Sequence, residues 1–332
     1  MKHSAYTQKK FSETTVVITG ASSGAGRAMA IELAKKGTKL LLVARREDAL
    51  KEVVKQCNEI GGMALGMPAD VTDADTIKQV ASVAKEFGGS VDVWINNAGV
   101  LAAGAFDETP IEVHHQVINT NLIGYLNGAH AVLPYFKQQG YGLLINNISV
   151  GGWIPVPYSV GYSSSKYGLC GFSEALRAEL ITWPQIKICD LFPAFLDTPG
   201  IQHAANYTGK VLVPAPPVYD PQQLAKAVVS VIEAPRKSVA FGAVAPLLKF
   251  SNAIAPSVTR LVASKVIEGY LKQAEPTAST SGNVFKAVDF GTGIHGGWNK
   301  PSTGINKKVL AGFFLGALAA GFVWVTNKKV SL

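Results

Sequence analysis

The stretch at 15–33, TVVITGASSGAGRAMAIEL, constrains the fold more than any other part of this chain. It predicts a buried strand, because the β-branched run at 16–18 is typical of a parallel strand covered on both faces. Gly20, Gly24 and Gly26 follow as TGxxxGxG, a pattern in which the backbone turns tightly and approaches a ligand closely. A helix begins there, and its free N–H groups and positive dipole end suit a pyrophosphate. The three parts together predict a dinucleotide site.

Strands and helices alternate along the rest of the chain as far as residue 245. Apolar runs predict strands at 39–44, 63–67, 91–95, 142–148 and 187–192, with a seventh candidate at 239–242. Segments with helical spacing separate these runs. Such alternation predicts an α/β fold with a doubly wound parallel sheet, in one domain over 12–245.

Charged residues follow the second and third predicted strands. Arg45 and Arg46 stand where an acidic residue would bind ribose hydroxyls, whereas arginine pairs with a 2′-phosphate, so the sequence favours NADP(H) over NAD(H). Alternatively, both arginines are solvated and simply open the next helix. Asp70, followed by Val71, has two equal interpretations: it accepts a hydrogen bond from the adenine amine, or it is a turn residue.

Further polar residues stand at the later strand ends and in the helices beside them. Asn97, Ala98 and Gly99 follow the fourth strand and leave room for a cofactor. Asn121 lies within a predicted helix, where asparagine is intrinsically unfavourable and needs an explanation. Ser149 follows the fifth strand.

Tyr162 and Lys166 open the next predicted helix and are four residues apart. Side chains at this spacing lie on one helical face, about 5 to 6 Å apart at Cβ. An ammonium can therefore act on a phenol.

With these motifs in this order, the chain resembles the short-chain dehydrogenase/reductase family, in its compact single-domain branch. The resemblance covers about 12–240 and rests on TGASSGAG at 19–26, NNAG at 96–99, Ser149, and YSSSK at 162–166. It implies a Rossmann-like fold. The chain departs from the family's usual Pro-Gly at Pro193-Ala194, which affects a local turn.

The resemblance implies a role for each motif residue. Tyr162 would exchange a proton with the substrate's carbonyl or hydroxyl oxygen, and Ser149 would bind and polarise that oxygen. Lys166 would hold the nicotinamide ribose and favour tyrosinate, while Asn121 would hold a water in a proton relay. No metal is expected. The predicted cofactor-binding residues are Gly20, Ser22, Ser23, Gly24, Gly26, Arg45, Arg46, Asp70, Val71, Asn97, Ala98, Gly99, Tyr162, Lys166, Pro193, Leu196 and Thr198.

The substrate side is predicted to be apolar. Residues 200–220, which cover the substrate in this family, are rich in proline and tyrosine and have no arginine cluster. Trp153, Ile154 and Phe195 are expected nearby. We therefore expect a hydrophobic carbonyl or alcohol, such as a lipid, steroid, retinoid or long-chain ketone.

The C-terminal part predicts a membrane anchor. Residues 309–325 are seventeen residues without a charge, about 25 Å as a helix, and a transmembrane helix is predicted over 309–326. A buried helix is the alternative, but the stretch has no polar side. Its single GxxxG either pairs two helices or faces lipid. Residues 246–274 predict a helical segment that lies at a membrane surface or covers the core, and 275–308 predict a flexible tether.

Charge and cysteine content limit the classes of binding partner and compartment expected for this chain. The net charge is +8, but lysine and arginine are scattered and no nucleic-acid motif is found, so an anionic cofactor and membrane lipid explain the charge better. The three cysteines are widely spaced and predict buried thiols. The need for NADP(H) and the lack of a signal peptide predict a cytosolic catalytic domain. The resemblance also implies a homodimer or homotetramer.

The function expected is thus a membrane-anchored, NADP(H)-dependent oxidoreductase. The main alternative is a catalytically idle nucleotide-binding scaffold at a membrane, although such a scaffold has no need of Ser149, Tyr162 and Lys166 together. A sugar-nucleotide epimerase would normally have a different glycine spacing and a larger substrate domain.

Overall fold

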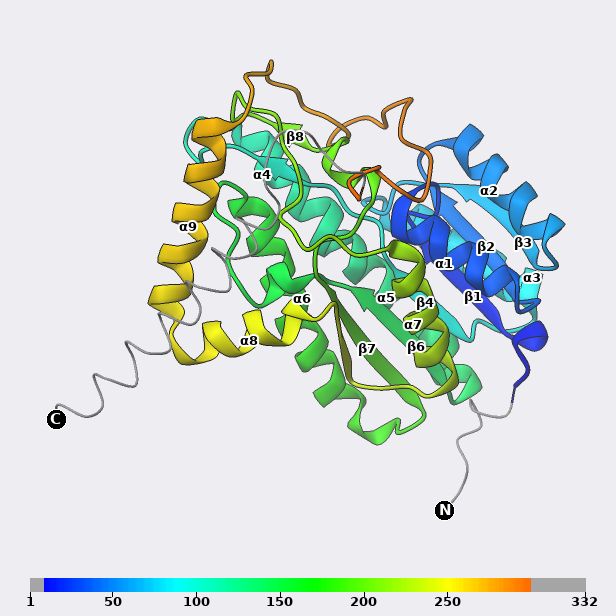
Figure 1. The fold of residues 1–332 in the computed structure, drawn as a ribbon. Coiled ribbons are helices and arrows are strands. Elements are labelled where there is room, and N and C mark those ends of the chain that lie inside the picture. The colour runs from blue at the N-terminus through cyan, green and yellow to red at the C-terminus, as the bar shows by residue number, and fades with distance from the viewer. Residues whose placement is uncertain (1–8, 300–332) are drawn as a thin grey trace, which may run out of the picture.

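A seven-stranded parallel sheet forms the centre of the computed structural model, which describes residues 9–299 (Figure 1). The strand order is β3-β2-β1-β4-β6-β7-β9. This confirms the predicted α/β fold, with the strand candidate at 239–242 as the seventh strand. The strands are β1 (Thr15–Thr19), β2 (Lys39–Ala44), β3 (Met63–Pro68), β4 (Val93–Asn96), β6 (Gly142–Asn147), β7 (Ile186–Pro193) and β9 (Ser238–Phe241).

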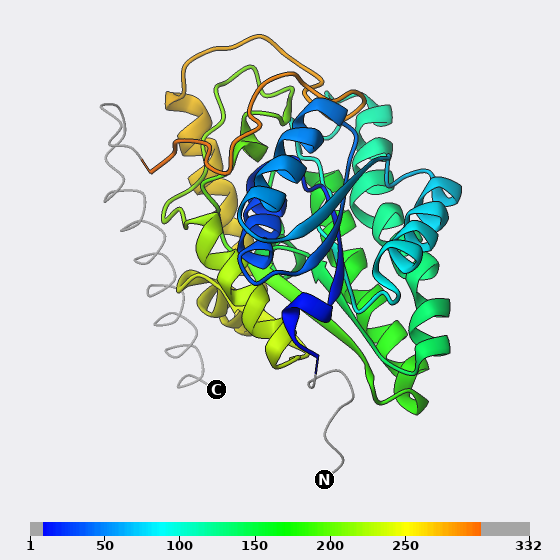
Figure 2. The same ribbon diagram turned by 90° about the vertical axis from the view of Figure 1, so that its right-hand side faces the viewer.

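Helices cover both faces of this sheet (Figures 1 and 2). One core packs α1, α2 and α7 against one face, and a second packs α3, α5 and α6 against the other. Side chains alternate along a strand, so Val16 and Ile18 lie in the first core while Val17 lies in the second. The helices are α1 (Gly24–Ala34), α2 (Glu47–Glu59), α3 (Ala74–Gly88), α4 (Ile111–Ile118), α5 (Gly124–Gln139), α6 (Val160–Glu179), α7 (Pro221–Glu233), α8 (Val244–Ile254) and α9 (Pro256–Gln273).

The chain direction across the sheet reverses between β1 and β4. From β1 the chain proceeds outward to β2 and β3 on one side, and then crosses back to β4 on the other. Open parallel sheets bind ligands at the carboxyl ends of the strands beside such a reversal. A short parallel pair, β5 (Ala102–Ala103) with β8 (Ala205–Asn206), ties two loops together near this edge.

The chain after α9 returns across the end of the sheet towards α1, as both ribbon views show in orange (Figures 1 and 2). We call residues 275–299 the C-terminal strap. A flexible tether is predicted over 275–308; its part up to residue 299 is packed here, and residues 300–308 lie outside the described residues. The strap's backbone carbonyls accept hydrogen bonds from Arg27, Arg45 and Arg46, and these contacts replace hydration of a polar segment.

The predicted transmembrane helix at 309–326 lies outside the described residues. From residue 9 to residue 299, none of the helices is both long enough and apolar enough to cross a membrane. Cys57 and Cys189 are buried free thiols, and Cys170 is a partly buried one.

Candidate active site

One cavity of about 510 Å³ lies at the carboxyl edge of the sheet. It brings together nearly all the predicted site residues; among the catalytic and cofactor-binding ones, only Gly26 and Asn121 are outside its lining. The predicted residues that line it are Gly20, Ser22, Ser23, Gly24, Arg45, Arg46, Asp70, Val71, Asn97, Ala98, Gly99, Ser149, Tyr162, Lys166, Pro193, Leu196 and Thr198.

The glycine-rich turn joins β1 to α1 at one end of this cavity. Gly20 and Gly24 have φ angles of +66° and +53°, which L side chains rarely adopt. Gly26 closes the turn from behind, because a Cβ there would lie 2.2 Å from the Gly20 carbonyl oxygen and 2.6 Å from Asn97 Nδ2. The Gly24 N–H donates to the Gly293 carbonyl at 2.9 Å, so this amide of the predicted phosphate turn is already bound to the C-terminal strap.

Asn97 fixes the turn against the end of β4. Its Nδ2 donates to the carbonyls of Thr19 at 3.0 Å and Gly20 at 3.2 Å, while Asn147 Nδ2 donates to its Oδ1 at 2.8 Å. The Asn97 amide therefore does more than leave room for a cofactor, because it connects the carboxyl ends of β1, β4 and β6.

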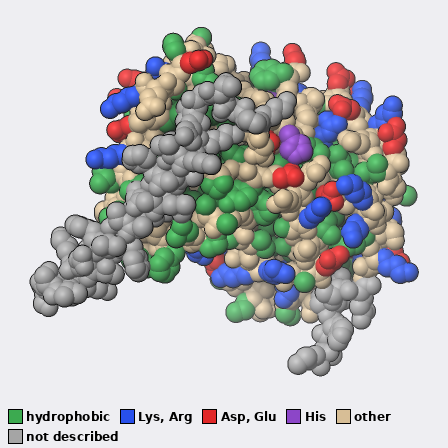
Figure 3. Space-filling view, viewed as in Figure 1, with side chains coloured by type: hydrophobic (Ala, Val, Ile, Leu, Met, Phe, Trp, Pro, Cys, Tyr) green, Lys and Arg blue, Asp and Glu red, His purple; other side chains and the backbone are tan. Residues whose placement is uncertain are grey.

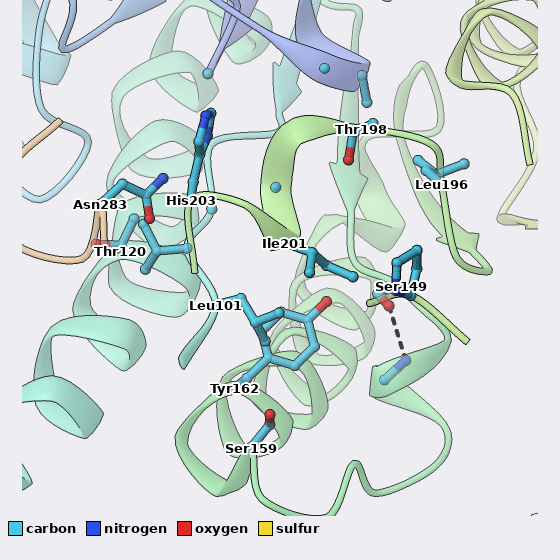
Figure 4. A pocket seen from close by; sticks show the side chains of 18 of the residues that line it. Leu101, Thr120, Ser149, Ser159, Tyr162, Leu196, Thr198, Ile201, His203 and Asn283 are labelled. Carbon is cyan, nitrogen blue, oxygen red and sulfur yellow. Dashed lines mark hydrogen bonds between the residues drawn. The ribbon is translucent and has the colours of Figure 1, made fainter. Parts of the chain in front are cut away.

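Ser149 follows β6 in a strained backbone conformation, with φ of 117°. Its Oγ accepts a hydrogen bond from the Gly151 N–H at 3.1 Å, which fixes the side chain (Figure 4). A Cβ on Gly151 would lie 3.0 Å from Tyr162 Cε1 and 3.6 Å from Ser149 Oγ, so both groups border the same small space. Strain of this kind occurs preferentially at functional sites.

Tyr162 and Lys166 project from the first turns of α6 into the cavity. Tyr162 points its hydroxyl towards Ser149 (Figure 4). Lys166 Nζ lies 5.7 Å from the centroid of the Tyr162 ring and 5.1 Å from that of Tyr125, and it donates to the Asn147 carbonyl at 3.2 Å. The phenol, the ammonium and the serine hydroxyl thus converge as predicted.

Burial shifts the pKa values of both ionisable groups. Loss of solvation raises the pKa of Tyr162, and a hydrogen bond with Ser149 acts in the opposite direction. Loss of solvation lowers the pKa of Lys166 to about 7. Both shifts disfavour the charged forms taken singly, whereas a phenolate and an ammonium side by side would stabilise each other. Lys166 therefore titrates near neutral pH.

Asn121 lies outside the cavity, in a π-helical segment at Asn119–Ile123 that joins α4 to α5. Its Oδ1 accepts from the Val100 N–H and its Nδ2 donates to the Val100 carbonyl, both at 2.8 Å. This pair of bonds explains an asparagine in a helix, because the amide replaces a strand partner for Val100.

Arg45 and Arg46 both line the cavity, and both also bind the strap. Arg45 Nη2 donates to the Asn283 carbonyl at 2.6 Å, and its Nη1 lies 3.9 Å from Asp70 Oδ2. Asp70 accepts from the Thr72 N–H and hydroxyl at 2.9 Å, so it is a turn residue that also faces the cavity. The two interpretations of Asp70 are compatible.

The far end of the cavity is apolar. Trp153, expected here, instead stacks on Phe192 with ring centroids 3.8 Å apart, and it is absent from the lining. Ile154 and Phe195 do line the cavity, as do Leu101, Val150, Val156, Pro157, Ile201, Leu212, Val213, Pro214 and Ala215.

Two groups of lining residues were not predicted from the sequence. Ile267, Tyr270 and Leu271 of α9 reach the apolar end, and their spacing by three and four was a detectable helical stripe. Asn283 and Val288 reach the opposite end from the strap. No sequence pattern predicted a role for Asn283 or Val288, because the strap has the composition of a flexible linker.

The lining residues fit a nicotinamide dinucleotide. The cavity has the size of a cofactor site, a helix N-terminus at the glycine turn and two guanidiniums at one end. Asn147, which lines it near Lys166, has a buried Oδ1 with no hydrogen-bond partner in the described part of the chain. A buried acceptor without a partner costs free energy unless a ligand supplies a donor.

Comparison with known proteins finds similar oxidoreductases. Residues 14–207 match the family model described as short chain dehydrogenase. An uncharacterized oxidoreductase of Bacillus subtilis strain 168, YxnA, is 30% identical, covering 97% of this chain and 92% of its own. A substituted actinorhodin polyketide ketoreductase solved with NADPH has a TM-score of 0.64 at 28% identity, over 71% of this chain and 97% of that chain. An alcohol dehydrogenase of Thermococcus sibiricus complexed with 5-hydroxy-NADP has a TM-score of 0.60 at 28% identity, over 69% and 95%.

Proposed function

This chain belongs to the short-chain dehydrogenase family and is an NAD(P)-dependent oxidoreductase, for which we propose NADP(H) as cofactor and an apolar carbonyl or alcohol as substrate. One observation carries the proposal: Ser149, Tyr162 and Lys166 border the same cavity as the glycine turn and the arginine pair. An idle scaffold would not require these three side chains together.

The protein's own residues bind the substrate oxygen and move its proton. The nicotinamide cofactor supplies or accepts the hydride when it is bound. Ser149 is positioned to hold the substrate oxygen, because Gly151 fixes its hydroxyl beside the Tyr162 ring. Tyr162 exchanges the proton at that oxygen. Protonated Lys166 favours the phenolate by charge, which opposes the effect of burial on the pKa of Tyr162.

The arginines support the choice of NADP(H). A guanidinium has five N–H donors, and Arg45 uses one of them on the Asn283 carbonyl. The remaining donors can bind a 2′-phosphate in the bidentate manner that arginine favours. The two NADP(H)-bound structural relatives named above are consistent with this proposal.

The substrate class is proposed from the apolar end of the cavity. Residues of the 200–220 loop and of α9 line it, and Lys166 is the only lysine or arginine among the lining residues besides the arginine pair. Hydrophobic side chains also gather in the centre of the face in Figure 3, between α8 and α9 on one side and α1 and α2 on the other. A hydrophobic ketone or alcohol fits the apolar end of the cavity.

We also propose attachment to a membrane, with the catalytic domain in the cytosol where NADP(H) is available. The α8 and α9 helices leave Phe250 at 55% and Leu261 at 56% exposed, next to exposed Lys249 and Arg260. Exposed apolar and basic side chains on these two helices suit an anionic lipid interface. Digestion of the catalytic domain by protease added outside intact cells would contradict this orientation. We further propose that the chain forms a homodimer or a homotetramer. Its mass in solution, measured by analytical ultracentrifugation, tests this.

The proposed reaction is tested by Tyr162→Phe. We expect wild-type protein to oxidise NADPH with hydrophobic carbonyls, and the variant to lose this activity by at least about a hundredfold, because general acid–base catalysis contributes that much. NADPH binding, followed by its fluorescence, should remain. Activity retained in Tyr162→Phe, or turnover of small charged carbonyls only, would contradict the proposal.

A further inference from the structure

The C-terminal strap forms part of the wall of the cofactor cavity. Asn283, Ala287 and Val288 line the cavity at the end that also contains Arg45 and Arg46. Figure 4 shows Asn283 beside His203, away from Ser149 and the Tyr162 hydroxyl. The strap therefore contributes to the arginine end of the cavity, far from the reacting groups.

Close contacts hold the strap at this place. The Asn283 N–H donates to the His203 carbonyl at 2.8 Å. Gly282 has φ of +50°, and a Cβ there would lie 2.2 Å from the same carbonyl, so only glycine permits this approach. His203 Nε2 lies 3.0 Å from the Phe290 carbonyl oxygen, which adds a second attachment.

The strap also orients both arginines. The Asn283 carbonyl accepts from Arg45 Nη2 at 2.6 Å, and the carbonyls of Val288 and Phe290 accept from Arg46 Nη1 at 2.7 and 3.0 Å. Hydrogen bonds to a charged group are about twice as strong as neutral ones. Each guanidinium is thereby held from the side of the strap and keeps other donors for a ligand.

The side-chain oxygen of Asn283, unlike its backbone, makes no such contact in the described part of the chain. Its Oδ1 is buried and has no hydrogen-bond partner among residues 9–299, although the residue faces the cavity. Leaving a buried amide oxygen without a donor costs free energy. An amide carries both an acceptor and two donors, as the ribose, adenine amine and 2′-phosphate of an adenosine 2′-phosphate would require.

We propose that Asn283 is a cofactor-binding residue that contacts the adenosine 2′-phosphate end of NADP(H), and that the strap carbonyls set the two arginines for the same group. This inference rests on the proposed function, because it names a residue of the same site. It assigns part of cofactor selection to a segment that begins about thirty residues after the last strand of the sheet.

The test is direct binding of NADPH and of adenosine 2′,5′-bisphosphate, measured by calorimetry on the full chain without substrate. We expect Asn283→Ala to weaken both by about five- to tenfold, the loss of one or two hydrogen bonds. Ser279→Ala, an exposed truncation on the same strap, is the matched control and should bind like wild type. Wild-type affinity in Asn283→Ala would overturn the proposal. Tighter binding would overturn it too, because the strap would then obstruct the site.

A second variant keeps the proposal testable if Asn283→Ala fails to fold. Asn283→Asp has the same shape and adds a negative charge beside Arg45, so it should weaken the 2′,5′-bisphosphate much more than 5′-AMP. Equal effects on the two nucleotides would overturn the proposal. If wild-type protein itself binds neither NADPH nor the bisphosphate, the proposed function fails instead, and the two failures are thereby distinguished.

Discussion

The buried Lys166 gives a stability prediction that needs no substrate or cofactor. Its pKa is about 7 in the folded chain against 10.5 for an ordinary lysine, with burial as the cause. Between these two values the unfolded chain binds one proton more than the folded chain does. Stability therefore rises with pH in this interval, because proton release favours the state that holds fewer protons.

The size follows from the two pKa values. From pH 7 to pH 9 the folded Lys166 is mostly neutral while the unfolded one stays charged, and each pH unit is worth about 1.36 kcal/mol. The free energy of unfolding should thus increase by roughly 2 to 3 kcal/mol over this range from Lys166 alone. Below pH 7 both states are protonated and its contribution becomes constant.

The assay compares wild type with Lys166→Met by urea denaturation from pH 6 to pH 9. Methionine has a similar length and cannot ionise, so the difference between the two unfolding free energies isolates this residue. The buried thiols, including Cys57 with its pKa raised to about 12, are common to both proteins and cancel. Lys187→Met, on an exposed lysine of β7, is the control and should give a flat difference.

The refuting result is a wild-type curve parallel to the Lys166→Met curve across pH 6 to 9. It would mean that Lys166 is solvated in the free protein. Its role in favouring the phenolate would then have to act without the desolvation described above.

Three further changes test the rest of the site. Gly26→Ala places a Cβ 2.2 Å from the Gly20 carbonyl, so NADPH affinity should fall at least about tenfold in a fluorescence titration; unchanged affinity would mean that the turn relaxes freely. Arg45→Glu should lower the ratio of NADPH to NADH affinity by about ten- to a hundredfold, and an unaltered ratio would exclude a 2′-phosphate contact. Asn121→Ala should lower the free energy of unfolding by about 2 to 4 kcal/mol, because Val100 loses both partners; a loss of activity at full stability would favour the relay instead.

Local patterns were sufficient to predict the sheet and the common face of Tyr162 and Lys166, while their catalytic roles were implied by the family resemblance. Apolar runs marked every strand of the seven-stranded sheet. The inner strands leave a continuous apolar signal because they are buried on both faces, whereas the edge strands β3 and β9 are partly exposed. Tyr162 and Lys166 were predictable because helical spacing fixes their common face. Asn97 was placed correctly, but its role in holding the turn depends on partners in β1 and β6 that no local pattern shows.

Long-range contacts account for what the sequence did not predict. The strap is rich in residues typical of linkers, and its order comes from guanidiniums more than two hundred positions earlier. Trp153 was expected at the substrate, yet Phe192 offers it a better stacking surface behind the cavity. Asn121 was selected as a candidate site residue because asparagine is unfavourable within a helix. The π-helical segment that directs its amide to Val100 has no local sequence signature.

The bond between the Gly24 N–H and the Gly293 carbonyl has a consequence for biosynthesis. A ribosome makes the glycine turn well before it reaches residue 293. A nascent chain can therefore form its sheet before the C-terminal strap has been made and has completed the lining of the cofactor cavity. Cofactor capture should therefore be among the last events of maturation, and premature termination after the final sheet strand should yield a folded but poorly loaded product.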